Sequence, residues 1–283
     1  MSKLQLMGET MSVTDIFKSD LFKGKNVFIT GGGSGINLGI AHSFASLGAN
    51  IAICGRTEEK LAKAADQLKS YGIEVFYDTA DVRDADRLKD VVDKSAEVLG
   101  SIDVLVAAAA GNFLCMANKM STNAFKSVID IDLLGSFNAC SAAFPHLKAS
   151  KGNIIFISAG MSYMPYTAQC HVGAAKAGID NLMKNLALEW GRYGIRSNSI
   201  VPGPIAGTEG VSRLAPGEMA EKFAHLIPLG RMGDKAEIGN VAVFLASPLA
   251  SYITGSVVIV DGGQNLPGSG GFTHLVSQMM RGS

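Results

Sequence analysis

A glycine-rich turn between a strand-like run and a helix-like run constrains this chain most. The run Asn-Val-Phe-Ile-Thr at residues 26–30 is apolar and of strand length, and the glycines follow it at once. From residue 36 to residue 47, apolar residues recur at the spacing of one helix face. Glycines let a backbone approach a pyrophosphate closely, and a helix N-terminus faces its negative charge. We therefore predict a nucleotide-binding turn rather than a plain tight turn, with the phosphates held by Gly31, Gly33, Ser34, Gly35 and Ile36.

Strand-length apolar runs and helix-length stretches alternate along most of the chain. Further strands are expected at residues 50–54, 75–77, 104–106, 153–157, 197–201 and 256–260. Helices are expected over residues 36–47, 58–71, 84–99, 123–147 and 168–192. Strands that are apolar throughout and alternate with helices are typical of a parallel sheet covered on both faces. Right-handed crossovers then give an α/β doubly wound Rossmann fold, with a mostly parallel seven-stranded sheet and a ligand crevice at its carboxyl edge.

Length and composition indicate one catalytic domain. A chain of 283 residues, 47% of them apolar, is ample for one large core. We expect an N-terminal arm over residues 1–20, the Rossmann catalytic domain over 21–265 and a C-terminal tail over 266–283. The loop-like stretch 202–228, with a short helix near 217–226, is expected to form a lid over the crevice.

Charge and cysteine usage argue against several classes of protein. Lys and Arg total 25 and Asp and Glu total 25, so the zero net charge gives no support to nucleic-acid or membrane-surface binding. The four cysteines are scattered singly, so we expect reduced thiols and neither a disulfide framework nor a metal site. The apolar runs are too short for a membrane span. Because no signal-peptide core begins the chain and Arg281-Gly282-Ser283 is not a peroxisomal tripeptide, we expect a cytoplasmic protein.

The end of the second strand bears on the choice of nicotinamide cofactor. An acidic residue there usually accepts hydrogen bonds from the ribose 2′-hydroxyl of NAD. This chain instead has Gly55 and Arg56, with Lys60 one helical turn further on. A planar guanidinium suits a 2′-phosphate, so we predict NADP(H). After the third strand, Asp81 and Val82 lie where an adenine edge can meet an acceptor, an assignment that depends on comparison with a family pattern.

Together these residues resemble the short-chain dehydrogenase/reductase family over residues 22–263. Other matching pieces are Ala109-Ala110-Gly111, Lys176, Pro202-Gly203 and Asp261-Gly262-Gly263. The resemblance implies that Lys176 holds the nicotinamide ribose. It also implies that residues around the nicotinamide and pyrophosphate complete the cofactor site, namely Ala109, Pro202, Gly203, Ile205 and Thr208.

The departures from this family pattern bear on the chemistry. The tyrosine of the family's Tyr-x-x-x-Lys pair falls on Val172, its serine partner on Ala159 and the central-helix asparagine on Asp132. The third glycine of the cofactor turn falls on Asn37, which leaves helix packing there open. Reduction of a ketone puts negative charge on one oxygen and needs a nearby proton donor. Hydride delivery to a conjugated thioester spreads the charge over a dienolate, which can be protonated later at carbon.

The chain also resembles one enzyme type within this family, and that resemblance includes the absence of the tyrosine. The segments 110–115, 130–132, 171–176 and 202–210 closely resemble those of peroxisomal 2,4-dienoyl-CoA reductases, which also lack the tyrosine and carry this aspartate. The resemblance implies NADPH-dependent reduction of a 2,4-dienoyl-CoA to a trans-3-enoyl-CoA in unsaturated fatty acid degradation. It implies that Asp132 and Lys176 act on a water that protonates the dienolate. It further implies a homo-oligomer, a tetramer, with contacts through long helices such as 168–192.

The same resemblance indicates contacts to the acyl-CoA substrate. Two arginines suit CoA phosphates, and one phenylalanine suits the wall of an acyl channel. The full predicted set is Arg83, Phe113, Ser121, Thr122, Asn123 and Arg213.

Some alternatives stay open at this level. His171 adjoins the vacant tyrosine position, and Tyr163 and Tyr166 lie in the preceding loop, so each is a candidate acid. A reductase acting on another enoyl or 3-oxoacyl thioester, or on an unrelated carbonyl, is a second function. A non-catalytic NADP(H)-binding protein is a third.

Overall fold

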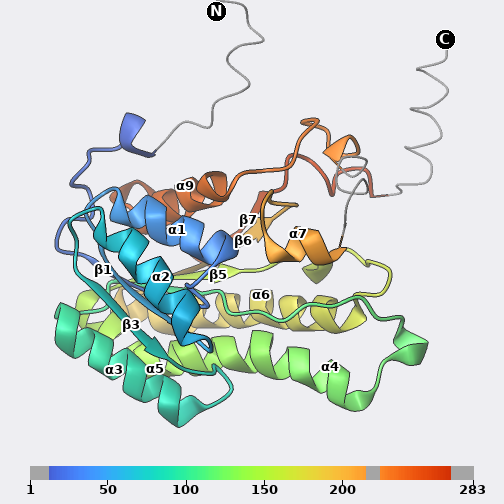
Figure 1. Cartoon of the computed structure of the whole chain (residues 1–283), viewed down its shortest axis with the longest axis horizontal. Helices are drawn as coiled ribbons and strands as arrows, with labels where there is room; N and C mark the ends of the chain where they lie inside the picture. The colour runs from blue at the N-terminus through green and yellow to red at the C-terminus, as the bar shows by residue number, and fades with distance from the viewer. Residues whose placement is uncertain (1–12, 215–223, 269–283) are drawn as a thin grey trace, which may run out of the picture.

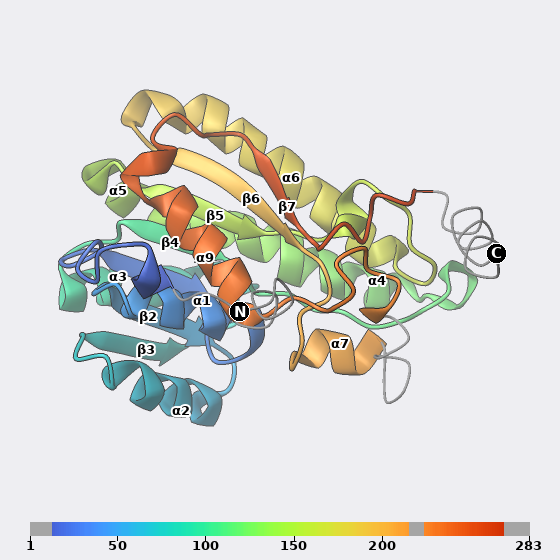
Figure 2. The same cartoon turned by 90° about the horizontal axis from the view of Figure 1, so that it is seen from above.

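Seven strands form one parallel sheet within residues 13–214 and 224–268, the part of the chain that the computed structural model describes (Figure 1). They are β1 (Asn26–Thr30), β2 (Asn50–Gly55), β3 (Val75–Thr79), β4 (Val104–Ala107), β5 (Asn153–Ile157), β6 (Arg196–Pro202) and β7 (Val257–Val260). Their spatial order is β3-β2-β1-β4-β5-β6-β7, and every neighbouring pair is parallel (Figure 2). The predicted doubly wound Rossmann fold is confirmed, with a sheet that is parallel throughout.

Helices cover both faces of this sheet (Figure 1). One layer holds α1 (Gly35–Ala45), α2 (Glu58–Lys69) and α9 (Lys235–Ala246). The other holds α3 (Ala85–Leu99), α5 (Gly135–Ser150) and α6 (Cys170–Trp190). Shorter elements are α4 (Thr122–Val128), α7 (Glu209–Leu214) and the 3-10 turns η2 (Val13–Asp15), η3 (Ala117–Lys119), η5 (Gly160–Ser162), η6 (Gly191–Tyr193) and η7 (Pro248–Ala250).

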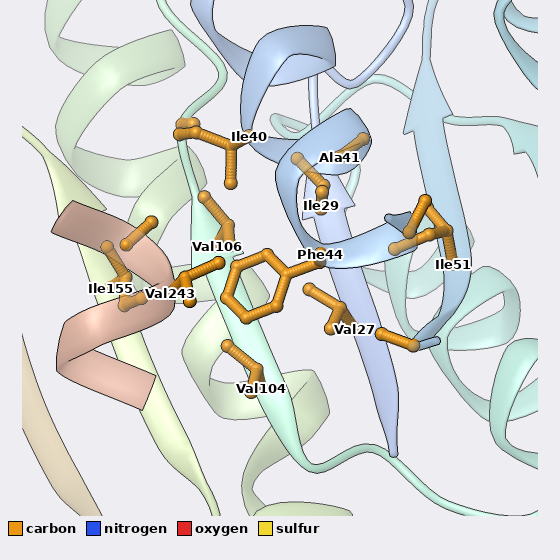
Figure 3. Close-up of a cluster of buried hydrophobic side chains, with 14 of the residues drawn as sticks. Val27, Ile29, Ile40, Ala41, Phe44, Ile51, Val104, Val106, Ile155 and Val243 are labelled. Carbon is orange, nitrogen blue, oxygen red and sulfur yellow. The ribbon is translucent and has the colours of Figure 1, made fainter. Parts of the chain in front are cut away.

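Alternate side chains of each central strand serve opposite helix layers. In β1, Val27 and Ile29 pack toward the layer of α1, whereas Phe28 packs toward the layer of α5. Successive strand residues point to opposite faces, so a strand buried on both sides is apolar at every position. Figure 3 shows the ring of Phe44, from α1, close to Val27 and Val104 of the sheet. This packing fixes α1, and with it the glycine turn from which α1 starts.

Helices α1 and α9 cross in close contact. A Cβ at Gly39 would lie 2.6 Å from the Cβ of Lys235, and one at Gly239 would lie 2.1 Å from the Oγ of Ser43. No side chain fits at either glycine, so the two backbones approach directly. This contact with α9 fixes the position of α1, the helix that follows the predicted cofactor turn.

The stretch predicted as one helix over residues 123–147 contains a π-helical turn. Helix α4 runs into this turn, η4 (Ile129–Leu134), which runs on into α5. Such turns widen a helix by one residue and occur frequently at functional sites. Within η4, Asp130 pairs with Lys126 near the surface, whereas Asp132 is completely buried.

The ends of the chain and the expected lid are described in part. Val13 is buried in the layer of α1, so part of the arm expected over 1–20 packs on the domain. Residues 1–12, 215–223 and 269–283 lie outside the described residues, and they include most of the short helix expected near 217–226. The described helix of the expected lid is α7, and the division into arm, domain, lid and tail stays a prediction. None of the helices within the described ranges has the length and apolar character needed to cross a membrane.

Candidate active site

Residues at the carboxyl ends of neighbouring strands converge on one crevice, as expected for a doubly wound parallel sheet. Gly31 follows β1, Arg56 follows β2 and Ser158 follows β5, and all three line a cavity of about 440 Å³. We name it the nucleotide cavity. Its wall includes the predicted cofactor residues Gly31, Gly33, Ser34, Gly35, Ile36, Arg56, Lys60, Asp81, Val82, Ala109, Lys176 and Thr208. The other predicted cofactor residues, Pro202, Gly203 and Ile205, line an adjoining cavity.

The glycine turn forms a cradle that fits a pyrophosphate. Gly31 has φ of +68°, and a Cβ there would lie 3.2 Å from the Cα of Ala109. Gly35, the first residue of α1, also has a positive φ, of +62°. The N-cap residue Ser34 makes no side-chain capping bond, so its hydroxyl does not occupy the first N–H groups of α1. Those groups suit an anion at the helix start.

Asn37 stabilises this turn from the place of the family's third glycine. Its Nδ2 donates to the main-chain oxygens of Thr30 at 3.2 Å, Gly31 at 3.2 Å and Ala108 at 3.0 Å. The side chain therefore ties the ends of β1 and β4 to the turn. Gly39, two residues on, supplies the close helix packing. The sequence departure at Asn37 is thus compatible with an intact turn.

Two cations stand on the wall of the nucleotide cavity near the end of β2. Arg56 and Lys60 both line it, and the ammonium of Lys60 lies 2.8 Å from a carboxylate oxygen of Glu209 in α7. A guanidinium and an ammonium at this place suit a phosphate on the ribose.

Asp81 and Arg83 are held together. The Nε of Arg83 donates to Oδ1 of Asp81 at 2.9 Å, and its Nη2 donates to Oδ2 at 2.6 Å. This guanidinium lowers the pKa of the Asp81 carboxyl below its usual value. From the sequence, Asp81 is predicted to contact the adenine of the cofactor and Arg83 a phosphate of CoA. Asp81 does line the nucleotide cavity, whereas Arg83 lines neither cavity.

The adjoining cavity, of about 390 Å³, we name the acyl cavity. Its wall includes apolar residues such as Leu114, Met161 and Val211. Gly111, Ser158 and Lys176 line both cavities, so the two meet at these residues. A ligand in one cavity can therefore reach a ligand in the other beside Lys176.

Asp132 and Lys176 form a buried ion pair beside this junction. The Nζ of Lys176 lies 3.2 Å from Oδ2 of Asp132 and donates to the main-chain oxygen of Ile157 at 3.0 Å. The N–H of Gly111 donates to Oδ1 of Asp132 at 2.7 Å. Asp132 is 0% exposed and Lys176 is 5% exposed. Each charge therefore depends on the other for compensation, because an unpaired buried charge is costly. The structure brings together the two residues predicted to be catalytic.

The positions of the missing tyrosine and serine are filled by apolar side chains. Val172 is buried with Val128 and Ala175, and it borders the acyl cavity together with Ala159. The preceding residue, Ser158, borders both cavities. Its hydroxyl is buried and has no hydrogen-bond partner within the described residues. The site therefore has a hydroxyl displaced by one position from the usual serine, at Ser158, and no phenol at position 172.

His171 lies behind the acyl cavity rather than in its wall. Its ring is 0% exposed and packs 4.4 Å, centroid to centroid, from the ring of Phe113. Neither ring nitrogen makes a well-aligned hydrogen bond within residues 13–214 and 224–268. Burial lowers the pKa of His171. A buried imidazole outside the wall is poorly placed to protonate a ligand, and Phe113 likewise lines neither cavity.

The two candidate tyrosines fasten the segment after β7 to the loop before α6. The hydroxyl of Tyr166 donates to Oδ1 of Asn265 and accepts from Nε2 of Gln264 at 3.3 Å. The hydroxyl of Tyr163 accepts from Nδ2 of Asn265 at 3.1 Å. Burial raises the pKa of both phenols. Tyr166 and Gln264 also border the acyl cavity, so this network forms part of its wall.

The remaining predicted substrate residues lie away from both cavities. The hydroxyl of Ser121 accepts from the N–H of Ala124 at 3.2 Å and so caps α4, followed by Thr122 and Asn123. None of these three predicted residues lines either cavity. Arg213 belongs to α7, and its side chain lies outside the described residues.

Several polar residues of the acyl cavity were not assigned from the sequence, among them Asn112, Ser158, Thr167, Gln169 and Gln264. Asn112 belongs to the segment 110–115, which resembles that of the 2,4-dienoyl-CoA reductases, but the sequence analysis predicts no role for it. No sequence motif points to Gln169. Gln169 is placed by tertiary contacts, since its Nε2 donates to the main-chain oxygens of Phe113 at 2.9 Å and Ala168 at 3.2 Å.

Comparison with known proteins defines the class of this fold and site. The family model described as Enoyl-(Acyl carrier protein) reductase matches residues 31–265. The crystal structure of a short chain dehydrogenase from Bacillus anthracis is 40% identical, with a TM-score of 0.78, covering 86% of this chain and 97% of that one. Levodione reductase is 30% identical with a TM-score of 0.83, covering 87% and 99%. The chain belongs to the short-chain dehydrogenase/reductase family and is an oxidoreductase.

Among its relatives, the chain is similar to peroxisomal 2,4-dienoyl-CoA reductases. It is 47% identical to the (3E)-enoyl-CoA-producing enzyme of Saccharomyces cerevisiae over 251 residues, 87% of this chain and 86% of the relative. The mouse enzyme is 41% identical over 264 residues, 92% and 90% of the two chains. A probable 2,4-dienoyl-CoA reductase of Bacillus subtilis, (2E)-enoyl-CoA-producing, is 38% identical over 244 residues, 85% and 96%. The resemblance drawn from the motifs is confirmed.

Proposed function

We propose that this oxidoreductase reduces a 2,4-dienoyl-CoA to a trans-3-enoyl-CoA with NADPH, in the degradation of unsaturated fatty acids. The observation that carries the proposal is the buried Asp132–Lys176 pair at the junction of the two cavities, with valine at position 172. A ketone reductase would need a proton donor on the carbonyl oxygen at that place. The similarity to relatives that bear this activity in their names supports the same reading.

NADP(H) fits the nucleotide cavity. The glycine cradle suits the pyrophosphate, Arg56 and Lys60 suit the 2′-phosphate, and Asp81 suits the adenine edge. When bound in reduced form, the cofactor supplies the hydride. Lys176, on the wall of both cavities, is proposed to bind the nicotinamide ribose and to keep the local field positive.

Asp132 and Lys176 are then proposed to control the protonation of the dienolate. In this proposal, Asp132 and Lys176 together hold a water at the α-carbon of the dienolate. Oδ1 of Asp132 is fixed by Gly111, which leaves Oδ2 to orient the water with Lys176. Protonation at the α-carbon leaves the remaining double bond at position 3 of the acyl chain.

The acyl-CoA substrate is proposed to enter the acyl cavity with its CoA outside. Asn112, Gln169 and Ser158 are among the polar groups of that wall, which also include Asp132, Lys176, Tyr166 and Gln264, and much of the remaining wall is apolar. Arg83, Phe113, Ser121, Thr122, Asn123 and Arg213 stay proposed contacts on the strength of the resemblance.

A homotetramer is also proposed from the resemblance. Phe137 on α5 is 49% exposed and Leu188 on α6 is 82% exposed, so both helices carry large apolar side chains in contact with solvent. Subunit contacts would cover such side chains. Sedimentation of the purified protein measures the oligomeric state directly.

The cytoplasmic location stays a prediction from the sequence. The peroxisomal location named for the relatives belongs to those proteins.

Turnover of NADPH with 2,4-hexadienoyl-CoA and 2,4-decadienoyl-CoA tests the function. We expect oxidation of NADPH with at least one of them and a trans-3-enoyl-CoA product by chromatography. A 3-oxoacyl-CoA serves as the comparison substrate and should react far more slowly. Faster reduction of the 3-oxoacyl thioester, or no turnover of any dienoyl thioester, would contradict the proposal.

A further inference from the structure

An ion pair joins two helices across the wall of the nucleotide cavity. Lys60 belongs to α2 and Glu209 to α7, and their charged atoms lie 2.8 Å apart. Both side chains line the cavity together with Arg56. Their side chains are 54% and 57% exposed, so water and a nucleotide can reach both groups. Figure 2 shows α2 and α7 on the same side of the molecule.

We propose that Glu209 is a specificity-determining residue for the cofactor's 2′-phosphate, because it competes with that phosphate for the ammonium of Lys60. The inference rests on the proposed NADP(H) preference. The anionic side chain holds Lys60 in the free enzyme, so a nucleotide with a 2′-phosphate must displace one anion to gain the cation. A nucleotide with a 2′-hydroxyl gains nothing from the exchange.

The charges set the direction of this exchange. A phosphate monoester carries more charge than a carboxylate and offers three acceptor oxygens, so it is the better partner for Lys60 beside Arg56. Once bound, the phosphate also repels the carboxylate of Glu209. Binding of a 2′-phosphate therefore releases α7 from α2, whereas binding of a 2′-hydroxyl nucleotide leaves the ion pair in place.

Glu209→Gln removes the competing charge and keeps the side-chain shape. Calorimetric titration with 2′,5′-ADP should give a dissociation constant about twofold to fivefold lower than in the unaltered protein, within the range of an exposed charge pair. The dissociation constant for 5′-AMP should change by less than about 1.5-fold. Glu59→Gln is the matched control, because Glu59 is an exposed acid next to Lys60 that does not line the cavity. The control should leave the ratio of the two constants unchanged.

Backbone hydrogen exchange of residues 209–214 gives a second readout. In the unaltered protein, 2′,5′-ADP should raise exchange in this segment relative to 5′-AMP, because it breaks the tie to α2. In Glu209→Gln the two nucleotides should give the same exchange.

The outcomes separate the inference from the proposed function. Equal affinity of the unaltered protein for 2′,5′-ADP and 5′-AMP would overturn the NADP(H) preference and the inference with it. A clear preference for 2′,5′-ADP that Glu209→Gln does not increase, or that Glu59→Gln increases equally, would overturn the inference alone.

Discussion

The carboxylate of Asp132 and the ammonium of Lys176 lie 3.2 Å apart, both buried, where the nucleotide and acyl cavities meet. They come from the π turn η4 and from α6, and each is also fixed by main chain, through Gly111 and Ile157. A pair fixed in this way is preorganised and loses little entropy when it orients a water. The pair lines the acyl cavity together with Val172, which stands where the family pattern has a tyrosine.

Asp132→Asn should reduce turnover of the dienoyl thioester by about 100-fold, the usual contribution of one general acid–base group. The amide can still accept from Gly111, but it removes the negative charge beside Lys176. Steady-state kinetics gives the loss, and fluorescence titration should show NADPH affinity within about threefold of the unaltered protein. Asp130→Asn is the matched control, because Asp130 lies on the same turn and pairs with Lys126 instead. Equal activity of Asp132→Asn and the unaltered protein would remove Asp132 from the proposed mechanism.

Arg56→Gln should shift the cofactor preference toward NADH. Charged hydrogen bonds contribute about 1.5–3 kcal/mol, so kcat/KM with NADPH should fall by about 10-fold to 100-fold. The value with NADH should change by less than about threefold, since the 2′-hydroxyl needs no cation. Equal losses with both cofactors would place Arg56 at another part of the nucleotide.

The strands and the meeting of Asp132 with Lys176 were predictable from the sequence, whereas other details of the site were not. Strands such as β1 and β5 are short runs buried on both faces, so local composition reveals them. The pairing of Asp81 with Arg83 depends on side-chain direction in a loop, which periodicity does not report. The π turn at Asp132 looks like an ordinary helix in sequence, because one inserted residue barely alters the apolar spacing. Gln169 is positioned in part by the carbonyl group of Phe113, which is distant in the sequence.

Tyr166→Phe should leave turnover within about twofold of the unaltered protein. The phenol proton is already donated to Asn265, and burial raises the pKa of Tyr166, so it is a poor acid here. Loss of the hydrogen bonds to Asn265 and Gln264 should instead lower the free energy of unfolding by about 1 kcal/mol. Kinetics together with chemical denaturation separates the two effects. A 100-fold loss of kcat in a stably folded variant would make Tyr166 the proton donor.

Arg83→Ala should raise KM for the dienoyl-CoA by about tenfold and change kcat little. Asp81 occupies the Nε and one Nη2 hydrogen, so three of the five N–H donors of the guanidinium stay available to a phosphate of CoA. The N-acetylcysteamine thioester of the same acid lacks these phosphates, and its kinetics should not change. A similar loss with both thioesters would indicate that the variant acts through the released Asp81.

Stability should fall below neutral pH, in part because of His171. Burial lowers the pKa of this histidine in the folded state below its ordinary 6.5, against the opposing effects of the Phe113 main chain and the Asp132 carboxylate. Between the folded and unfolded pKa values the unfolded chain binds more protons, so the free energy of unfolding decreases as pH falls through 6.5.

His171→Leu keeps the packing on Phe113 and removes the titration, so its melting temperature should drop less between pH 8 and pH 5.5. The pKa of His42 is also lowered by burial and its effect remains in both proteins, so the difference between them isolates His171. His225→Gln, at an exposed histidine, is the control and should follow the unaltered protein. Parallel losses of melting temperature in His171→Leu and the unaltered protein would show that His171 takes up its proton in the folded state as readily as in the unfolded chain.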